Sequence, residues 1–204
     1  MRDAANLASL LREKSAKASR FMVGIAGPPA SGKSTFAEHV RDALIACGDT
    51  AIVVPMDGFH FDDAVLHARG HRQRKGAPHT FDVLGFEVLL KRIKAREPDI
   101  AIPVFDRTQE LSRAAAAIVT DEAKFIIVEG NYLLLKQKPW DRLKPLFDFT
   151  VYLSAPIAEL ERRLTQRWLD HGFDRAYAKN WIASNDLLNI KTVIAESAVA
   201  DVTV

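Results

Sequence analysis

Residues 23–40 read VGIAGPPASGKSTFAEHV, and this stretch decides the fold. An apolar run ends at Gly27, a loop of small residues and prolines follows, and an amphipathic segment begins at Lys33. The residues from Gly27 to Ser34 fit G-x-x-x-x-G-K-[ST], the phosphate-binding loop, with the strand before it and the helix after it that this motif requires. Glycine permits close backbone approaches, and the N–H groups of the loop and of the following helix form an anion site. The stretch therefore predicts that the chain binds a nucleoside triphosphate.

The same loop supplies the predicted contacts to the phosphates and to a metal ion. Lys33 adds a positive charge towards the β- and γ-phosphates, and the Ser34 hydroxyl is a ligand for Mg²⁺. The residues that we expect to bind the nucleotide are Gly27, Ala30, Ser31, Gly32, Lys33, Ser34 and Thr35.

Further apolar runs rich in valine and isoleucine predict buried parallel strands. These runs are FMVGIAG from Phe21, AIVVPM from Ala51, FIIVEG from Phe125 and FTVYLSA from Phe149. Helical patterns cover residues 33–47, 83–96 and 157–170, another starts at 174, and a short helix is expected within residues 1–20. Strands that alternate with helices predict an α/β fold with a mostly parallel sheet. We expect one domain over residues 1–204, with the polar stretch 70–78 as a surface loop.

Composition excludes several classes of partner. The chain has 204 residues and a formal net charge of +2, which is too small to indicate a nucleic-acid partner. Cys47 is the single cysteine, which fits a reducing cytoplasm. No apolar run approaches the roughly 20 residues that span a bilayer, so we expect a cytoplasmic protein without a membrane partner. A homodimer is left open.

Two carboxylates follow predicted strands. Glu129 ends the run FIIVEG, and Asp57 follows the run from Ala51, so both should lie at the edge where parallel sheets bind ligands. We expect Asp57 to emerge beside the strand that carries the phosphate-binding loop. Glu129 is our candidate for the Mg²⁺ shell, and Asp57 is our candidate base for a hydroxyl that attacks the phosphate. The alternatives are a solvent-facing glutamate and an ordinary Asp-Gly turn.

The ordered segments GPPASGKST, MDGFH, KGAPHTFD, IPVFDR and VEGNYLLL resemble the phosphoribulokinase/uridine kinase family of P-loop kinases. The chain is similar in particular to the pantothenate-kinase-related branch, which includes chains described as fructose transport system kinases. The resemblance covers about residues 21–189. It implies a three-layer P-loop nucleoside triphosphate hydrolase fold with a helical lid at about 156–175. It also implies transfer of the γ-phosphoryl group of ATP, with Mg²⁺, to a hydroxyl of a small metabolite.

The resemblance also implies roles for particular residues. Asp57 matches the catalytic aspartate, and Arg163 and Arg167 in ELERRLTQRW match lid arginines that neutralise the moving phosphoryl group. The positions that match acceptor-site segments are Lys75, Asp82, Arg107, Asn131 and Tyr132. His60 is a further acceptor candidate because it follows Asp57 closely, although a structural histidine is an equal alternative. Arg163 could instead pair with Glu159, four residues earlier.

The acceptor itself is not implied. GFHFDD and FDRTQE depart from the corresponding segments of uridine and pantothenate kinases, so neither uridine nor pantothenate carries over to this chain. A sugar, a nucleoside and a pantothenate-like molecule all stay open as the acceptor. A GTPase is disfavoured because no convincing N-K-x-D motif occurs, and a transport ATPase because no LSGGQ-like signature occurs. The alternative that we keep is a nucleotide-binding regulatory ATPase without a small-molecule acceptor.

Overall fold

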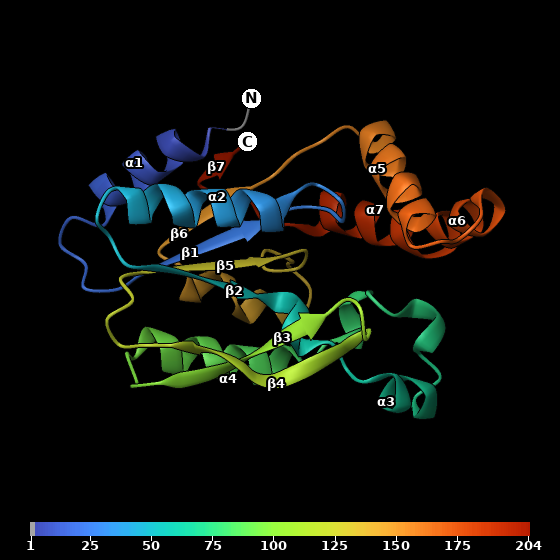
Figure 1. The fold of residues 1–204 in the computed structure, drawn as a ribbon, viewed down its shortest axis with the longest axis horizontal. Helices are drawn as coiled ribbons and strands as arrows, with labels where there is room; N and C mark the ends of the chain where they lie inside the picture. The colour runs from blue at the N-terminus through green and yellow to red at the C-terminus, as the bar shows by residue number, and fades with distance from the viewer. Residues whose placement is uncertain (1–2) are drawn as a thin grey trace.

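The computed structural model describes residues 3–204 (Figure 1). The α-helices are α1 (Ala4–Lys14), α2 (Lys33–Ala46), α3 (Asp63–Ala68), α4 (Val83–Lys94), α5 (Ile157–Asp170), α6 (Arg175–Trp181) and α7 (Leu187–Glu196). The strands are β1 (Phe21–Ala26), β2 (Ala51–Pro55), β3 (Ile100–Asp106), β4 (Leu111–Val119), β5 (Phe125–Gly130), β6 (Phe149–Tyr152) and β7 (Val202–Thr203). Short 3₁₀ turns are η1 (Met56–Phe59), η2 (Arg72–Arg74), η3 (Pro78–Thr80), η4 (Trp140–Arg142) and η5 (Lys144–Leu146), and η6 (Ile182–Asp186) is a π-helical turn. The helix expected within residues 1–20 is α1, and the part of that expectation on residues 1–2 lies outside the described chain.

The main sheet is parallel, with strand order β2-β5-β1-β6-β7. This confirms the predicted α/β fold with helices on a mostly parallel sheet. One expectation about neighbouring strands is wrong: β5 pairs with both β1 and β2, so Asp57 does not emerge beside the strand that carries the loop. The chain passes from β1 through α2 to β2 and later fills the position between them with β5. Glu129, at the end of β5, therefore lies between the loop and Asp57.

Hydrophobic cores on the two faces of the sheet produce the layers. Val23 and Ile25 of β1 pack with α1 and α2, through residues such as Val40, on one face. Met22 of the same strand packs with α4, through residues such as Phe86, on the other face. Figure 1 shows α1 and α2 above the sheet, and α4 with the β3–β4 hairpin below it. Alternate residues of one strand thus hold opposite layers, as the pleat requires.

The antiparallel β3–β4 hairpin was not predicted. Its second strand reads LSRAAAAIV, and alanine has a low preference for strands. Its first strand contains Pro103, which lacks an N–H for the ladder, and the register shifts between Ile102 and Val104. The tip of the hairpin carries Arg107 toward the end of β2, so this unpredicted element supplies one side of the site.

The C-terminal third extends beyond the ends of the strands. Figure 1 shows α5 and α6 at the far end of the molecule from α1, with α7 running back towards the sheet. Helix α5 has the predicted bounds, and the helix expected from Asp174 is present as α6 and α7, which are joined without a break by the π-helical turn η6. Leu160 and Leu164 of α5 pack on Ile182 and Ile190, so these elements share a small core of their own. Across residues 3–204, no helix combines the length and the apolar character that crossing a membrane demands.

Candidate active site

The loop between β1 and α2 forms a cradle of backbone groups. Gly32, at the N-cap of α2, has φ +88°, and no side chain caps the first N–H groups of this helix. A Cβ on Gly27 would lie 2.5 Å from the carbonyl oxygen of Leu153, so only glycine fits against the end of β6. Uncapped N–H groups at a helix N-terminus attract anions. The local geometry therefore suits a phosphate chain.

Lys33 lies inside this cradle. Its side chain is buried, and Nζ donates a hydrogen bond to the Pro28 carbonyl oxygen at 3.0 Å. Burial lowers the pKa of Lys33 to about 8, although the negative charges of Glu129 and Asp57 act in the opposite direction. A cation that burial destabilises in this way is poised to bind an anion.

Ser34 and Glu129 are brought together across α2 and β5. The Ser34 hydroxyl donates to Glu129 Oε1 at 3.2 Å. Burial, followed by the negative charge of Asp57, raises the pKa of Glu129 to about 7. Hydroxyl and carboxylate oxygens are the ligands that Mg²⁺ prefers, and a buried carboxylate gains from a nearby dication. The donor set therefore fits Mg²⁺.

The raised pKa of Glu129 predicts how stability depends on pH. Between pH 4.5 and 7 the unfolded chain loses this proton before the folded chain does, so Glu129 lowers the free energy of unfolding increasingly as pH rises. The penalty is absent below pH 4.5 and complete above pH 7. We expect Glu129→Gln to stabilise the ligand-free protein at pH 8 and to have little effect at pH 4.5. Urea unfolding of both proteins across this range measures the difference, and a constant difference would contradict the assignment.

Asp57 lies in η1, directly after β2. Its Oδ2 accepts a hydrogen bond from Nη2 of Arg107 at 2.9 Å, and its side chain is only partly exposed. His60 Nδ1 lies 2.9 Å from the Asp57 carbonyl oxygen, and burial lowers the pKa of His60. The carboxylate of the base candidate is therefore held by a hairpin arginine, and its backbone carbonyl by the imidazole of His60, which is uncharged at neutral pH.

A cavity of about 560 Å³ joins most of the predicted residues. From the phosphate-binding loop it is lined by Ala30, Gly32, Lys33, Ser34 and Thr35. From other elements it is lined by Asp57, His60, Lys75, Arg107, Glu129, Asn131 and Arg167. Burial, together with the nearby charge of Arg107, lowers the pKa of Arg167. The stretch 70–78, which was expected to be a surface loop, also lines this cavity through Arg72, Lys75 and Gly76. The Lys75 side chain is only 9% exposed.

Asp82, Tyr132 and Arg163 are not brought into the cavity. Asp82 caps α4, where Oδ1 accepts from Gly85 N at 3.0 Å. Tyr132 is buried behind the wall, and its hydroxyl donates to the Gly76 carbonyl oxygen.

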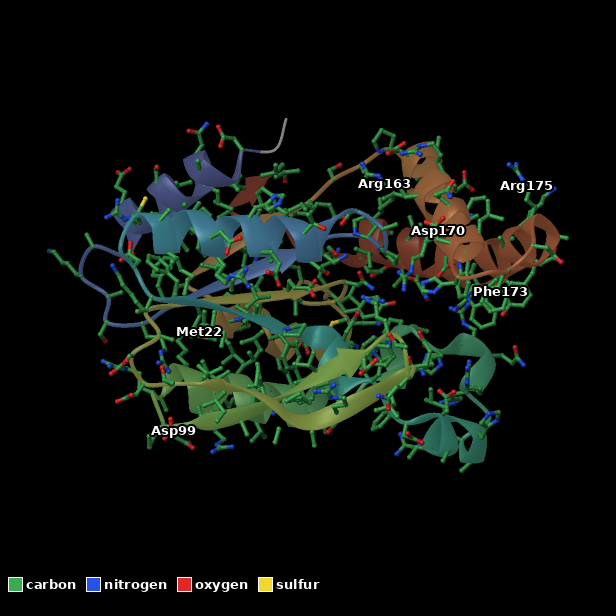
Figure 2. All side chains as sticks on the ribbon, in the orientation of Figure 1. Met22, Asp99, Arg163, Asp170, Phe173 and Arg175 are labelled. Carbon is green, nitrogen blue, oxygen red and sulfur yellow. The ribbon has the colours of Figure 1, made fainter. Side chains whose placement is uncertain are left out.

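Arg163 serves a neighbouring position. Arg163 pairs with Glu159 at 2.7 Å and donates a hydrogen bond to the Ala30 carbonyl oxygen at 3.2 Å, so it supports the phosphate-binding loop from α5. Figure 2 labels Arg163 on this helix. Arg163 and Arg167 therefore do not point at one anion in this conformation. Gly27 and Ser31 belong to the loop but do not line the cavity.

Sequence reasoning missed an aromatic wall of the cavity. The rings of Phe173 and Tyr177 stack with centroids 4.4 Å apart and an angle of 14°, and Tyr177 is nearly parallel to Trp181. Trp168 of α5 contacts all three rings. Figure 2 shows Phe173 on the side of α6 that faces the lower half of the molecule. The spacing of four residues between the α6 aromatics was the available signal. The same side of the cavity includes Asn185, Asp186 and Asn189, which η6 and α7 position.

The model of the phosphoribulokinase / uridine kinase family matches residues 22–184. The chain is 35% identical over 190 residues to the uncharacterised protein YggC of Escherichia coli K12, covering 91% of this chain and 77% of that protein. It is 32% identical to a pantothenate kinase of Parvibaculum lavamentivorans, covering 73% of this chain but only 48% of that enzyme. The chain thus spans about half the length of this pantothenate kinase. The crystal structure of a "putative fructose transport system kinase" from Silicibacter sp. TM1040 has 40% identity and a TM-score of 0.95, with both chains covered completely.

Proposed function

Because the chain belongs to the phosphoribulokinase/uridine kinase family, we propose that it transfers the γ-phosphoryl group of ATP to a hydroxyl group of a small metabolite. Membership makes the chain a phosphotransferase with an alcohol acceptor. One observation supports the proposal above others. A single cavity joins the loop lysine Lys33, the carboxylate of Asp57 and the pair formed by Ser34 and Glu129.

Each group has a proposed part in the transfer. The acceptor oxygen attacks the γ-phosphorus, the bond from this phosphorus to the bridging oxygen breaks, and ADP leaves. The hydroxyl proton passes to Asp57, and Oδ1 is the oxygen that we assign to it because Arg107 donates to Oδ2. Lys33 and Arg167 stabilise the negative charge on the transferred group.

The metal and the nucleotide base are assigned to opposite sides of the loop. Ser34 and Glu129 would hold Mg²⁺, which neutralises charge on the β- and γ-phosphates when bound. A second hollow of about 480 Å³ meets the loop at Pro28 and includes the exposed apolar residues Ile157, Ile194 and Val199. We assign the adenine ring to this hollow because it adjoins the loop and offers apolar side chains, together with a few polar ones, to a flat ring.

The proposal is tested with purified protein, ATP, Mg²⁺ and a panel of hydroxylated metabolites, with ADP release as the readout. Acceptor-dependent release is expected. Release that is independent of every acceptor would favour an ATPase, and nucleotide binding without turnover would favour a regulatory protein.

Metal removal gives a separate prediction. EDTA is expected to abolish turnover, because the phosphate charges then lack their counter-ion. Ser34→Ala is expected to raise the Mg²⁺ concentration for half-maximal rate by about tenfold or more, since it removes one oxygen from the donor set. Titration of Mg²⁺ against initial rate measures this shift, with Ser184→Ala in η6 as a control that should leave the curve unchanged. An unchanged curve for Ser34→Ala would remove Ser34 from the metal site.

A further inference from the structure

We propose that the acceptor is an uncharged, hydroxyl-rich molecule, not a carboxylate or a phosphate ester. The inference rests on the proposed function, because that function assigns Lys33 and Arg167 to the phosphates of ATP. It follows from how the remaining charges of the cavity are paired.

Arg72 and Lys75, two cations that line the cavity, are both paired with carboxylates. Asp63 Oδ2 accepts a hydrogen bond from Nε of Arg72, and Asp63 Oδ1 accepts one from Nζ of Lys75, both at 2.7 Å. Lys75 Nζ also donates to the Glu110 carbonyl oxygen at 2.9 Å and lies over the ring of Phe105. Glu110 Oε2 lies 3.8 Å from the same Nζ, so Asp63 and Glu110 together compensate both charges before any acceptor arrives.

The other cations leave no spare charge for an acceptor. Arg107 is paired with Asp57. Lys33 and Arg167 are the lysine and arginine of this cavity without a carboxylate partner among residues 3–204, and both are assigned to ATP. An anionic acceptor would have to displace Asp63 from a partner, which would leave a carboxylate uncompensated.

An acidic group of the cavity acts against an anion. Asp186 lines the cavity and accepts from Nε1 of Trp168 at 3.1 Å instead of pairing with a cation, whereas Glu110 is already paired with Lys75. Like charges placed together in a binding site disfavour binding strongly.

Neutral groups complete the same region. Asn131, Asn189 and His60 all line the cavity, and burial lowers the pKa of His60 so that its imidazole is uncharged at neutral pH. Amide and imidazole groups both donate and accept, which matches hydroxyl groups. The aromatic wall and Phe105 offer apolar faces against the carbon skeleton of a sugar or the ring of a nucleoside.

The chain is therefore expected to differ from the pantothenate kinases that it resembles in sequence, because pantothenate carries a carboxylate. Matched pairs of acceptors test this: pantothenol against pantothenate, glucitol against gluconate, and glucose against glucose 6-phosphate, together with ribose and uridine. In each pair that is turned over, we expect kcat/KM of the uncharged member to be at least about tenfold above that of its charged counterpart, as one like-charge contact predicts. A charged member that is preferred over its uncharged counterpart would overturn the inference. Ribose compared with uridine separates a sugar from a nucleoside.

A binding measurement decides the matter even if the panel lacks the true acceptor. Sulfate is titrated into the complex of the protein with Mg²⁺ and the non-hydrolysable analogue AMP-PNP, and the tryptophan fluorescence is recorded, because Trp168 and Trp181 line the cavity. We expect no saturable sulfate response in the wild type. Asp63→Asn should bind sulfate at least about tenfold more tightly than the wild type, because it leaves Arg72 without its carboxylate and Lys75 with only the more distant Glu110.

The matched control is Asp62→Asn, since Asp62 only caps α3 and asparagine is an equally good cap. Wild type that binds sulfate as tightly as Asp63→Asn would overturn the inference while the kinase proposal stands. Failure of the wild type to bind AMP-PNP would instead count against the proposed function itself.

Discussion

Asp57→Asn is expected to bind ATP with wild-type affinity and to lose about 10²–10⁴-fold in kcat, the range for removal of a general base. The amide keeps the size of the side chain and an oxygen for Arg107, which now donates to the carboxylate at 2.9 Å. It cannot take the proton of the acceptor hydroxyl. Because ATP binding depends on the loop and not on this proton transfer, the nucleotide affinity should not change.

The measurement is acceptor-dependent ADP release together with a nucleotide titration. Asp82→Asn is the matched control, because Asp82 caps α4 outside the cavity and asparagine caps helices equally well. We expect its kcat to stay within about twofold of wild type, because it loses no cavity contact. Wild-type kcat in Asp57→Asn with the true acceptor would exclude Asp57 as the base. A large loss in Asp82→Asn would return Asp82 to the acceptor site.

Local signals explain why much of the fold was predictable. Strands β1 and β5 are buried along their whole length, so their apolar runs were continuous and unambiguous. The bounds of α5 and the strand–loop–helix context of the phosphate-binding loop followed from similarly local patterns. The order of the strands did not, because uniformly apolar strands carry no mark of which neighbour they pair with. The position of β5 between β1 and β2 is set by long-range packing.

The site residues also divide into those that local sequence patterns locate and those that depend on tertiary contacts. Lys33, Ser34 and Glu129 meet because each lies at a strand end or helix start, which sequence patterns locate. Asp82 and Arg163 had competing local roles that the sequence also contained. An aspartate directly before a helix is a good N-cap, and a glutamate four residues before an arginine is its natural partner. The walls from the β3–β4 hairpin and from η6 depended on tertiary contacts that no local pattern reports.

Lys33→Met is expected to abolish detectable transfer while making the ligand-free protein more stable. Loss of one charged donor to the transferred phosphate should lower kcat by at least about 10²–10³-fold. In the absence of nucleotide, however, the lysine is buried and donates only to the Pro28 carbonyl oxygen, and burial lowers its pKa from 10.5 to about 8. That difference corresponds to roughly 3 kcal/mol against the protonated form. Methionine fills the same space without a charge.

The pH dependence of this stabilisation identifies its cause. Between pH 8 and 10.5 the unfolded chain still binds the lysine proton that the folded chain has released, so wild-type stability rises with pH in this window. The gain in Tm from Lys33→Met should therefore be full at pH 7, a few degrees for each kcal/mol in a chain of this size, and should vanish near pH 10.5. Calorimetric melting of both proteins across this range measures the gain, with Lys191→Met, exposed on α7, as the control expected to melt like wild type. A lower Tm for Lys33→Met at pH 7 would mean that attraction to Glu129 and Asp57 outweighs burial. The loop would then hold a satisfied ion pair instead of a cation that lacks its anion.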